Sequence, residues 1–224
     1  MERDVLTAIR AASELLADDV GFLTAHWKET FSAAVLFFVG VLGAAVVVKD
    51  DDSLLVRANE WIVRQLLRAF GKGSSARIAA VIFALNGCAI FVYMMSGGLV
   101  VLPWVFALLT GLNVGLSTMR MRSEALASRF AEFAEEYPEE LVKLCGVLVL
   151  LLELPCFWVS IGMGMRLGFD MTRSFTWGQF ERLSQQRVEA YLAVVLPLLA
   201  ISAVCEAIAI KGASSAQPPE DGEE

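Results

Sequence analysis

The chain has 224 residues, of which 57% are hydrophobic and 19% charged, and its formal net charge is −7. Soluble domains contain about 45–50% apolar and about 25% charged residues, and here the apolar excess is concentrated in blocks, which argues against a soluble protein. No basic patch with interleaved aromatic residues is present, so a nucleic-acid partner is excluded.

Residues 1–30 precede the first apolar block and are predicted to form an amphipathic helix at a membrane interface. Apolar residues recur there at roughly helical spacing, with acidic residues between them: Val5, Ile9, Leu15, Leu16 and Val20. Charged residues run through the whole segment, so we expect no cleavable signal peptide. The first apolar block would then remain as a membrane anchor.

Five apolar blocks follow, and each is close to the roughly 20 residues that a helix needs to cross a hydrocarbon core of about 30 Å. They are Phe31–Val48, Ile78–Met95, Leu99–Thr118, Leu144–Met165 and Tyr191–Ile210. The first block has no polar face beyond Ser32, which favours lipid over the interior of a soluble bundle. The predicted fold is all-α: a polytopic membrane helical bundle of five transmembrane helices over residues 31–211.

Three connecting segments are predicted to form amphipathic interfacial helices. The segment after Ser53 has a broad apolar face and a polar face that bears arginines, as helices that lie in the membrane interface do. A second such segment begins near Ser123, and a third, "FDMTRSFTWGQFERLSQQRVEA", follows the fourth span. The acidic, proline-bearing tail over residues 212–224 is predicted to be disordered.

Spans two and three are joined only by "SGG", Ser96–Gly98, which predicts a tight antiparallel helical hairpin. Each of these spans carries an asparagine, Asn86 in the second and Asn113 in the third. Gly111 and Gly115 have the small-xxx-small spacing that permits close contact between helices.

The fourth span contains Glu153 and, two residues later, Pro155. Proline removes a backbone donor and crowds the preceding helical turn. The sequence "SIGMGMRLG", with three glycines, follows. Together these features predict a broken or kinked fourth helix, and discontinuous helices commonly line ion or substrate sites in transporters.

The strongly polar side chains in or near the ends of the spans are Asn86, Asn113, Glu153 and Glu206. An intramembrane charge costs roughly 2.5–3.5 kcal/mol on insertion scales, so these groups are expected to face protein or water and to find partners. One interpretation is a set of hydrogen bonds that only join helices, each worth about 0.6 kcal/mol. The other is a polar pathway or substrate site in the bundle.

The order of several short motifs resembles the stage II sporulation protein M family. They are "FFVGVLGAA" in the first span, "NG" at Asn86, "GLNVG" at 111–115, "ELP" with "GMGMRLG" in the fourth span, and "LPLLAISAVCEAIAI" in the fifth. The matching positions in the fourth span include Glu153, Pro155, Gly164, Arg166 and Gly168. The family usually has Pro-His-Gly ahead of "ELP", where this chain has leucine, valine and leucine, so a role of that histidine does not transfer.

The resemblance implies a five-span integral membrane protein. The namesake of the family works in a complex that recruits and positions cell-wall hydrolases during engulfment, while relatives occur in organisms that form no spores. We therefore expect a multi-pass protein of the cytoplasmic (cell) membrane, with the lipid bilayer and either further copies of itself or other membrane proteins as partners.

The leading hypothesis from the sequence is a non-enzymatic membrane scaffold or assembly partner, since the connectors have exposed apolar faces and no catalytic constellation is visible. The alternative is a transporter or channel for a small solute, ion or lipid that uses a mid-membrane polar site around Glu153. An intramembrane enzyme is disfavoured because the only histidine, His26, lies outside the spans. The four cysteines form no CxxC pair, so no metal site, disulfide or cofactor is expected.

Overall fold

The computed structural model describes residues 21, 24–49, 54–70, 74–120, 137–173 and 176–215. Its elements are α2 (Trp27–Val47), α3 (Leu54–Phe70), α4 (Ser75–Met95), the 3₁₀ turn η1 (Ser96–Gly98), α5 (Leu102–Arg120), α7 (Glu139–Arg173), α8 (Trp177–Ala190), the π-helical turn η2 (Tyr191–Val195) and α9 (Leu196–Ser215). Most of the predicted N-terminal helix, the amphipathic segment after Ser123 and the tail beyond Ser215 lie outside the described residues. Residues 212–215, predicted to belong to that tail, are the last turn of α9.

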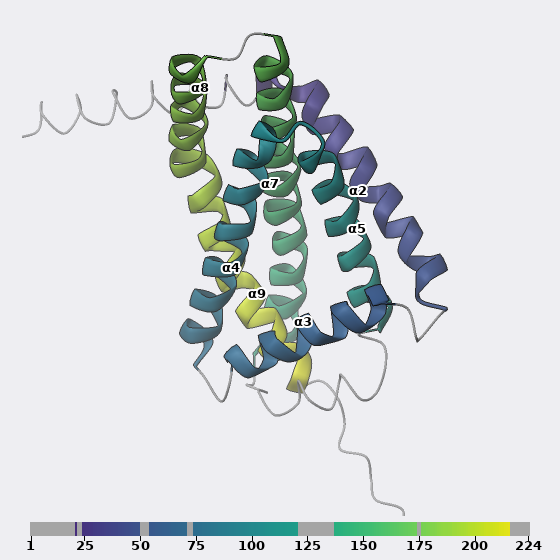
Figure 1. The fold of residues 1–224 in the computed structure, drawn as a ribbon. Coiled ribbons are helices and arrows are strands. Elements are labelled where there is room, and N and C mark those ends of the chain that lie inside the picture. The colour runs from purple at the N-terminus through teal and green to yellow at the C-terminus, as the bar shows by residue number, and fades with distance from the viewer. Residues whose placement is uncertain are drawn as a thin grey trace, which may run out of the picture.

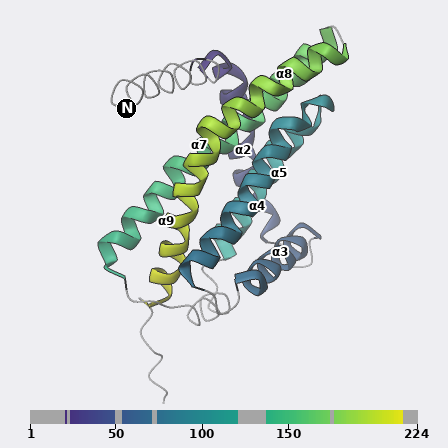
Figure 2. The same ribbon diagram turned by 90° about the vertical axis from the view of Figure 1, so that its left-hand side faces the viewer.

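Five long helices pack side by side as a bundle, and the described residues contain no strand (Figures 1 and 2). Each of the five predicted spans corresponds to a helix long and apolar enough to cross a membrane. Large apolar side chains cover the outside of the bundle, as Leu42 and Val46 of α2 show with exposures of 71% and 73%. Lipid is the solvent that suits such a surface, and the prediction of an all-α polytopic bundle is confirmed.

Helix α7 is the centre of the bundle, since it packs against α2, α4, α5 and α9. One buried cluster joins it to α4 and to the η2–α9 region through residues such as Ile90, Phe157 and Leu199. A second joins it to α2 and α5 through Ile161 and Met165. The remaining face of α7, with Leu151 64% exposed, is left for lipid.

The sequence predicted a broken or kinked fourth span. Helix α7 is continuous through Pro155 for 35 residues, so the span is not broken there, while the kink stays a prediction. Pro155 lies on the exposed outer face of this helix. Membrane helices tolerate such a proline where local adjustment and neighbouring helices satisfy the backbone. The irregular turn occurs in the last span instead, where the π turn η2 comes just before Pro197. Pro197 has no N–H to donate to the carbonyl of Ala193, which explains an adjustment there.

The glycines of "SIGMGMRLG" allow close packing at one end of the bundle. A Cβ at Gly162 would lie 2.7 Å from the backbone nitrogen of Thr30 in α2, and one at Gly168 would lie 3.0 Å from the carbonyl oxygen of Gly97 in η1. A Cβ at Gly164 would clash with the carbonyl oxygen of Tyr93 in α4. Three neighbours thus approach α7 where it lacks side chains, and the glycines serve contact rather than a helix break.

Helix α5 packs mainly against α2, not against α4 as the short "SGG" link predicted. A Cβ on Gly111 would clash with the carbonyl oxygen of Phe37, and one on Gly115 would lie 2.6 Å from the Cβ of Ala44. The predicted close contact at Gly111 and Gly115 is therefore made, but with α2. The hairpin prediction failed because η1 and the α7 glycines fill the space between the ends of α4 and α5.

Two connectors that looked alike in sequence have different orientations. Helix α3 lies across one end of the bundle (Figure 1), with Val56 and Phe70 buried against it and Leu54 81% exposed, as expected of an interfacial helix. Helix α8 instead continues through η2 into α9 as one long rod (Figure 2). The prediction that α8 lies flat is wrong, because no loop separates it from the fifth span.

Candidate functional site

The mid-membrane polar residues predicted from the sequence meet in part. The amide nitrogen Nδ2 of Asn86 on α4 donates a 2.9 Å hydrogen bond to Oε1 of Glu153 on α7. Glu206 on α9 lies within electrostatic range of the same carboxyl group, and the Ser202 hydroxyl faces it. We call Asn86, Glu153, Ser202 and Glu206 the polar cluster; it connects three helices.

Asn113 and Pro155 do not belong to the polar cluster. Asn113 is half-buried on α5, and no hydrogen bond joins its side chain to another described residue. Pro155 is exposed on the outer face of α7. Ser202, which the sequence analysis missed, lies one helical turn before Glu206, and that i, i+4 spacing is the signal that places both on one face of α9.

The two asparagines provide a matched pair of variants. Asn86→Leu should lower the stability of the bundle by about 0.6–1.7 kcal/mol, the range measured for interhelical hydrogen bonds in membranes. Asn113→Leu should change it by less than about 0.5 kcal/mol, as substitutions away from specific interactions do. Unfolding in mixed micelles measures both, and equal losses for the two variants would contradict the assigned geometry.

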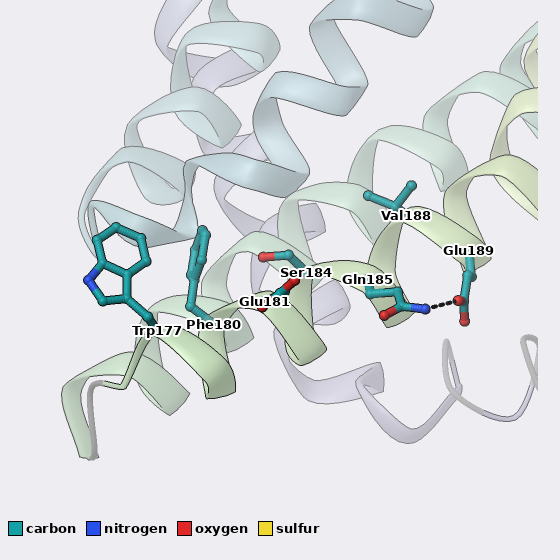
Figure 3. A pocket seen from close by; sticks show the side chains of 7 residues that line it. All are labelled: Trp177, Phe180, Glu181, Ser184, Gln185, Val188 and Glu189. Atoms are coloured by element: carbon teal, nitrogen blue, oxygen red, sulfur yellow. Dashed lines mark hydrogen bonds between the residues drawn. The ribbon is translucent and has the colours of Figure 1, made fainter.

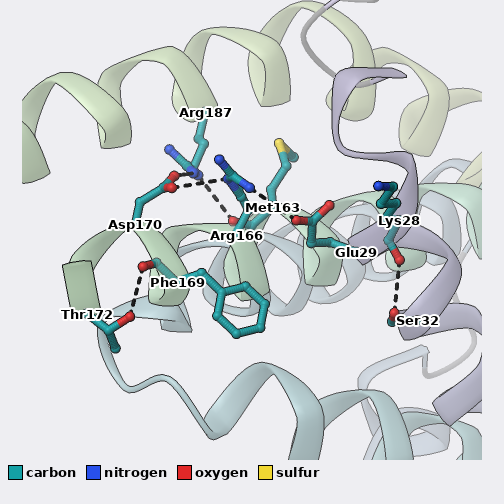
Figure 4. A network of polar contacts seen from close by, with 9 residues as sticks. All are labelled: Lys28, Glu29, Ser32, Met163, Arg166, Phe169, Asp170, Thr172 and Arg187. Atoms are coloured by element: carbon teal, nitrogen blue, oxygen red, sulfur yellow. Dashed lines mark hydrogen bonds and ion pairs between the residues drawn. The ribbon is translucent and has the colours of Figure 1, made fainter.

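A second polar group, the charge network, lies at the end of the bundle where α2 begins (Figure 4). Asp170 accepts from Nε of Arg166 at 3.1 Å and lies 3.6 Å from an Nη atom of Arg187. Arg166 also lies 3.5 Å from Glu29 of α2. Two arginines and two acids balance in charge, and they join α2, α7 and α8.

Arg187 is the most deeply buried member of the charge network, with 1% of its surface exposed. Its Nε donates to the Met163 carbonyl oxygen at 3.2 Å, and an Nη atom donates to the Leu183 carbonyl oxygen at 2.7 Å. Arg166, which the sequence analysis named as a family-motif position, links Glu29 to Asp170. The sequence signal for the network was the i, i+4 spacing of Arg166 and Asp170.

The outer face of α8 forms an open groove of about 680 Å³, which we call the α8 groove (Figure 3). Its described lining residues are Trp177, Phe180, Glu181, Ser184, Gln185, Val188 and Glu189. They recur at the i, i+3, i+4 and i+7 spacing of a single helix face. The lining combines apolar side chains with two acidic ones and has no described lysine or arginine.

The helix that carries the α8 groove is longer than a membrane requires. The run Trp177–Gly212 has 36 residues, which corresponds to about 54 Å, whereas a hydrocarbon core is about 30 Å thick. Helix α7, at 35 residues, exceeds it similarly. Both helices are therefore longer than such a core, and the polar sequence of α8, "WGQFERLSQQRVEA", favours the end with the charge network as the part that extends beyond it.

The chemistry of the described side chains is limited. In the described segments, no three or more His, Cys, Asp and Glu side chains gather where they could hold a metal ion. The four cysteines are free. Within the described part, the polar cluster, the charge network and the α8 groove are thus the features from which a function can be argued.

The family model for "Stage II sporulation protein M" matches residues 33–209, which is most of the chain. No curated protein and no solved structure matches the chain. The matched region includes the polar cluster, Arg166, Asp170 and Arg187, and the whole α8 groove. With its five membrane-spanning helices, the chain belongs to the stage II sporulation protein M family of multi-pass integral membrane proteins.

Proposed function

We propose that this chain is a non-enzymatic membrane scaffold that holds a partner protein in the α8 groove. The observation that carries the proposal is the α8 groove, which has a volume of about 680 Å³. It lies on a helix that is longer than the hydrocarbon core is thick. Trp177, at one end of the groove, is 74% exposed. Exposed aromatic side chains rimmed by polar ones mark protein interaction sites.

Charge indicates the kind of partner. The described groove residues include Glu181 and Glu189 and no basic residue, while Trp177, Phe180 and Val188 provide apolar contacts. A basic amphipathic helix complements both features, because its apolar side packs on the rings and its lysines or arginines meet the glutamates. The partner we propose is therefore a protein that carries such a helix.

The charge network suits α8 to this role. Arg187 binds α8 to α7 through Asp170 and the Met163 carbonyl, and Arg166 extends the connection to Glu29 of α2. Because these two Arg187 contacts hold α8 against α7, the helix loses little conformational freedom when a partner binds, which favours affinity. The lipid bilayer is the other partner, and we propose the cytoplasmic (cell) membrane as the location.

A photocrosslinking amino acid at Gln185 tests the scaffold proposal in native membranes. We expect a protein adduct whose crosslinked peptide is a basic amphipathic segment. The double charge reversal Glu181→Lys with Glu189→Lys should reduce that adduct at least about tenfold, since the groove and the basic partner would then carry like charges, which repel.

Two controls accompany this experiment. A crosslinker at Leu42, which faces lipid, should yield no such adduct, and reversing the exposed pair Glu139→Lys with Glu140→Lys at the other end of the bundle should leave it unchanged. An adduct that survives the groove reversal, or one formed only with a second copy of this chain, would contradict the proposal of a separate basic partner.

A transporter or channel for a small solute, ion or lipid is the second candidate, favoured by the polar cluster. Buried carboxyl groups within membrane spans commonly mark transport pathways. Glu153→Gln in reconstituted vesicles distinguishes the two functions: a transporter would lose flux of its solute, whereas a scaffold would keep its crosslinked partner. Unchanged fluxes in the variant would remove the transporter.

A further inference from the structure

The polar cluster brings oxygen-bearing side chains from three helices together near the middle of the bundle. Glu153 comes from α7, Ser202 and Glu206 from α9, and Asn86 from α4. Along their helices, all four are flanked by residues that are either buried in the core or exposed on the lipid-facing surface. If the cluster served only to join helices by hydrogen bonds, its polar atoms would all be paired. An unpaired oxygen atom in the cluster therefore indicates a further role.

Two oxygen atoms of the cluster are buried without a hydrogen-bond partner. The Ser202 side chain is 1% exposed, and its hydroxyl faces Glu153 without meeting an acceptor in hydrogen-bonding geometry. Oε2 of Glu206 is buried and also has no partner. Buried polar atoms in native proteins are satisfied by protein, water or an ion in the great majority of cases. Two such atoms in one cluster therefore point to a bound species.

The charge of the cluster restricts that species to a cation. Neither Glu153 nor Glu206 forms an ion pair with a lysine or arginine of the described chain. Two carboxyl groups that approach one another in a low-dielectric interior can both stay ionised only if a positive charge lies between them, and either a proton or a metal ion can supply it. The amide of Asn86 neutralises no charge, although turning it by half a rotation would offer its oxygen as a further ligand.

We propose that Glu153, Glu206, Ser202 and Asn86 form an intramembrane binding site for one small monovalent cation of the sodium class. The ligand atoms are all hard oxygens, which select alkali and alkaline-earth ions over soft metals. These four side chains reach the six oxygens that Ca²⁺ takes as a minimum only if both carboxylates bind through both of their oxygens. A proton shared by the two carboxyl groups is the competing species, and the experiments below distinguish it from a sodium-class ion.

Thermal unfolding of the purified full-length protein in detergent tests this site. In NaCl, compared with choline chloride at equal ionic strength, we expect a saturable rise in Tm of roughly 5–10 °C at a sodium concentration about a hundredfold above Kd. Radioactive sodium should bind with a stoichiometry of one ion per chain.

Variants assign the binding to the polar cluster. Glu206→Gln keeps the size of the side chain and removes its charge, so sodium affinity should fall at least about tenfold, while the Tm in choline chloride stays at or above that of the unsubstituted protein. Ser202→Ala removes a ligand without adding bulk and should also weaken binding. Glu139→Gln, an exposed glutamate on α7, is the matched control and should leave affinity unchanged.

No saturable sodium effect in the unsubstituted protein would overturn the proposal, as would an equal effect in Glu206→Gln and Ser202→Ala. A Tm that responds to pH but not to sodium would show a bound proton instead and would likewise overturn it. The site is independent of the scaffold function, because the α8 groove lies outside the cluster and its crosslinked adduct is measured separately.

Discussion

Replacing the buried Arg187 with methionine is expected to lower the free energy of unfolding by about 3 kcal/mol, the lower end of the cost of breaking a buried ion pair by removing one partner. The substitution leaves Asp170 with Arg166 alone and removes the side-chain donor from the Met163 and Leu183 carbonyls. Unfolding of the purified protein in mixed micelles measures the loss.

The same variant should also weaken partner binding, because Arg187 holds α8 against α7. The Gln185 crosslink should decrease in Arg187→Met even under conditions where the bundle remains folded. Arg182→Met is the matched control, since Arg182 is exposed on the same helix, and its effect should stay within about 0.5 kcal/mol. If Arg187→Met and Arg182→Met lowered the free energy of unfolding equally, Arg187 would contribute no more to stability than an exposed arginine, which would contradict the prediction.

The variant Gly111→Val should separate α5 from α2 and cost about 2–3 kcal/mol, the upper part of the range for overpacked interiors. Even a Cβ at this position would clash with the Phe37 carbonyl oxygen. Since neither backbone can give way without moving its whole helix, the contact is lost along its length. Unfolding in mixed micelles and crosslinking between cysteines placed on α2 and α5 would both report it.

Gly146→Val is the control for that prediction. A Cβ at Gly146 on α7 would meet nothing within 4 Å, so the same change in helix propensity occurs there without a clash. Its expected cost is below about 0.5 kcal/mol. If both glycine variants lost the same stability, close packing at Gly111 would not hold α2 and α5 together.

The five spans could be predicted from sequence because lipid imposes a strong and local requirement. A block of apolar residues long enough to cross the core is a helix whatever surrounds it. Buried polar groups are usually hydrogen-bonded, so the sequence could predict that Glu153 pairs with a polar residue of another span. Which of the two asparagines it pairs with depends on how each helix is rotated about its axis. Asn86 faces α7, while no hydrogen bond joins the side chain of Asn113 to another described residue.

Other features were set by packing between distant segments, which sequence periodicity does not report. Arg187 looked like one of several arginines in a polar connector, and only the approach of α7 buries it. The connector "TWGQFERLSQQRVEA" has the amphipathic pattern of an interfacial helix, yet its continuation into the fifth span makes it upright. Pro155 predicted a break or a kink, and the break does not occur: α7 is continuous, with the proline on its exposed face.

The central claim is that α8 stands upright and presents its groove to water at the end of the bundle where α2 begins. Labelling with a membrane-impermeant maleimide tests it most directly, in a background where the four cysteines are replaced by alanine. We predict that Gln185→Cys and Lys28→Cys react from one side, Glu140→Cys reacts from the other, and Leu42→Cys does not react. An unreactive Gln185→Cys, or one labelled from the same side as Glu140→Cys, would contradict the claim.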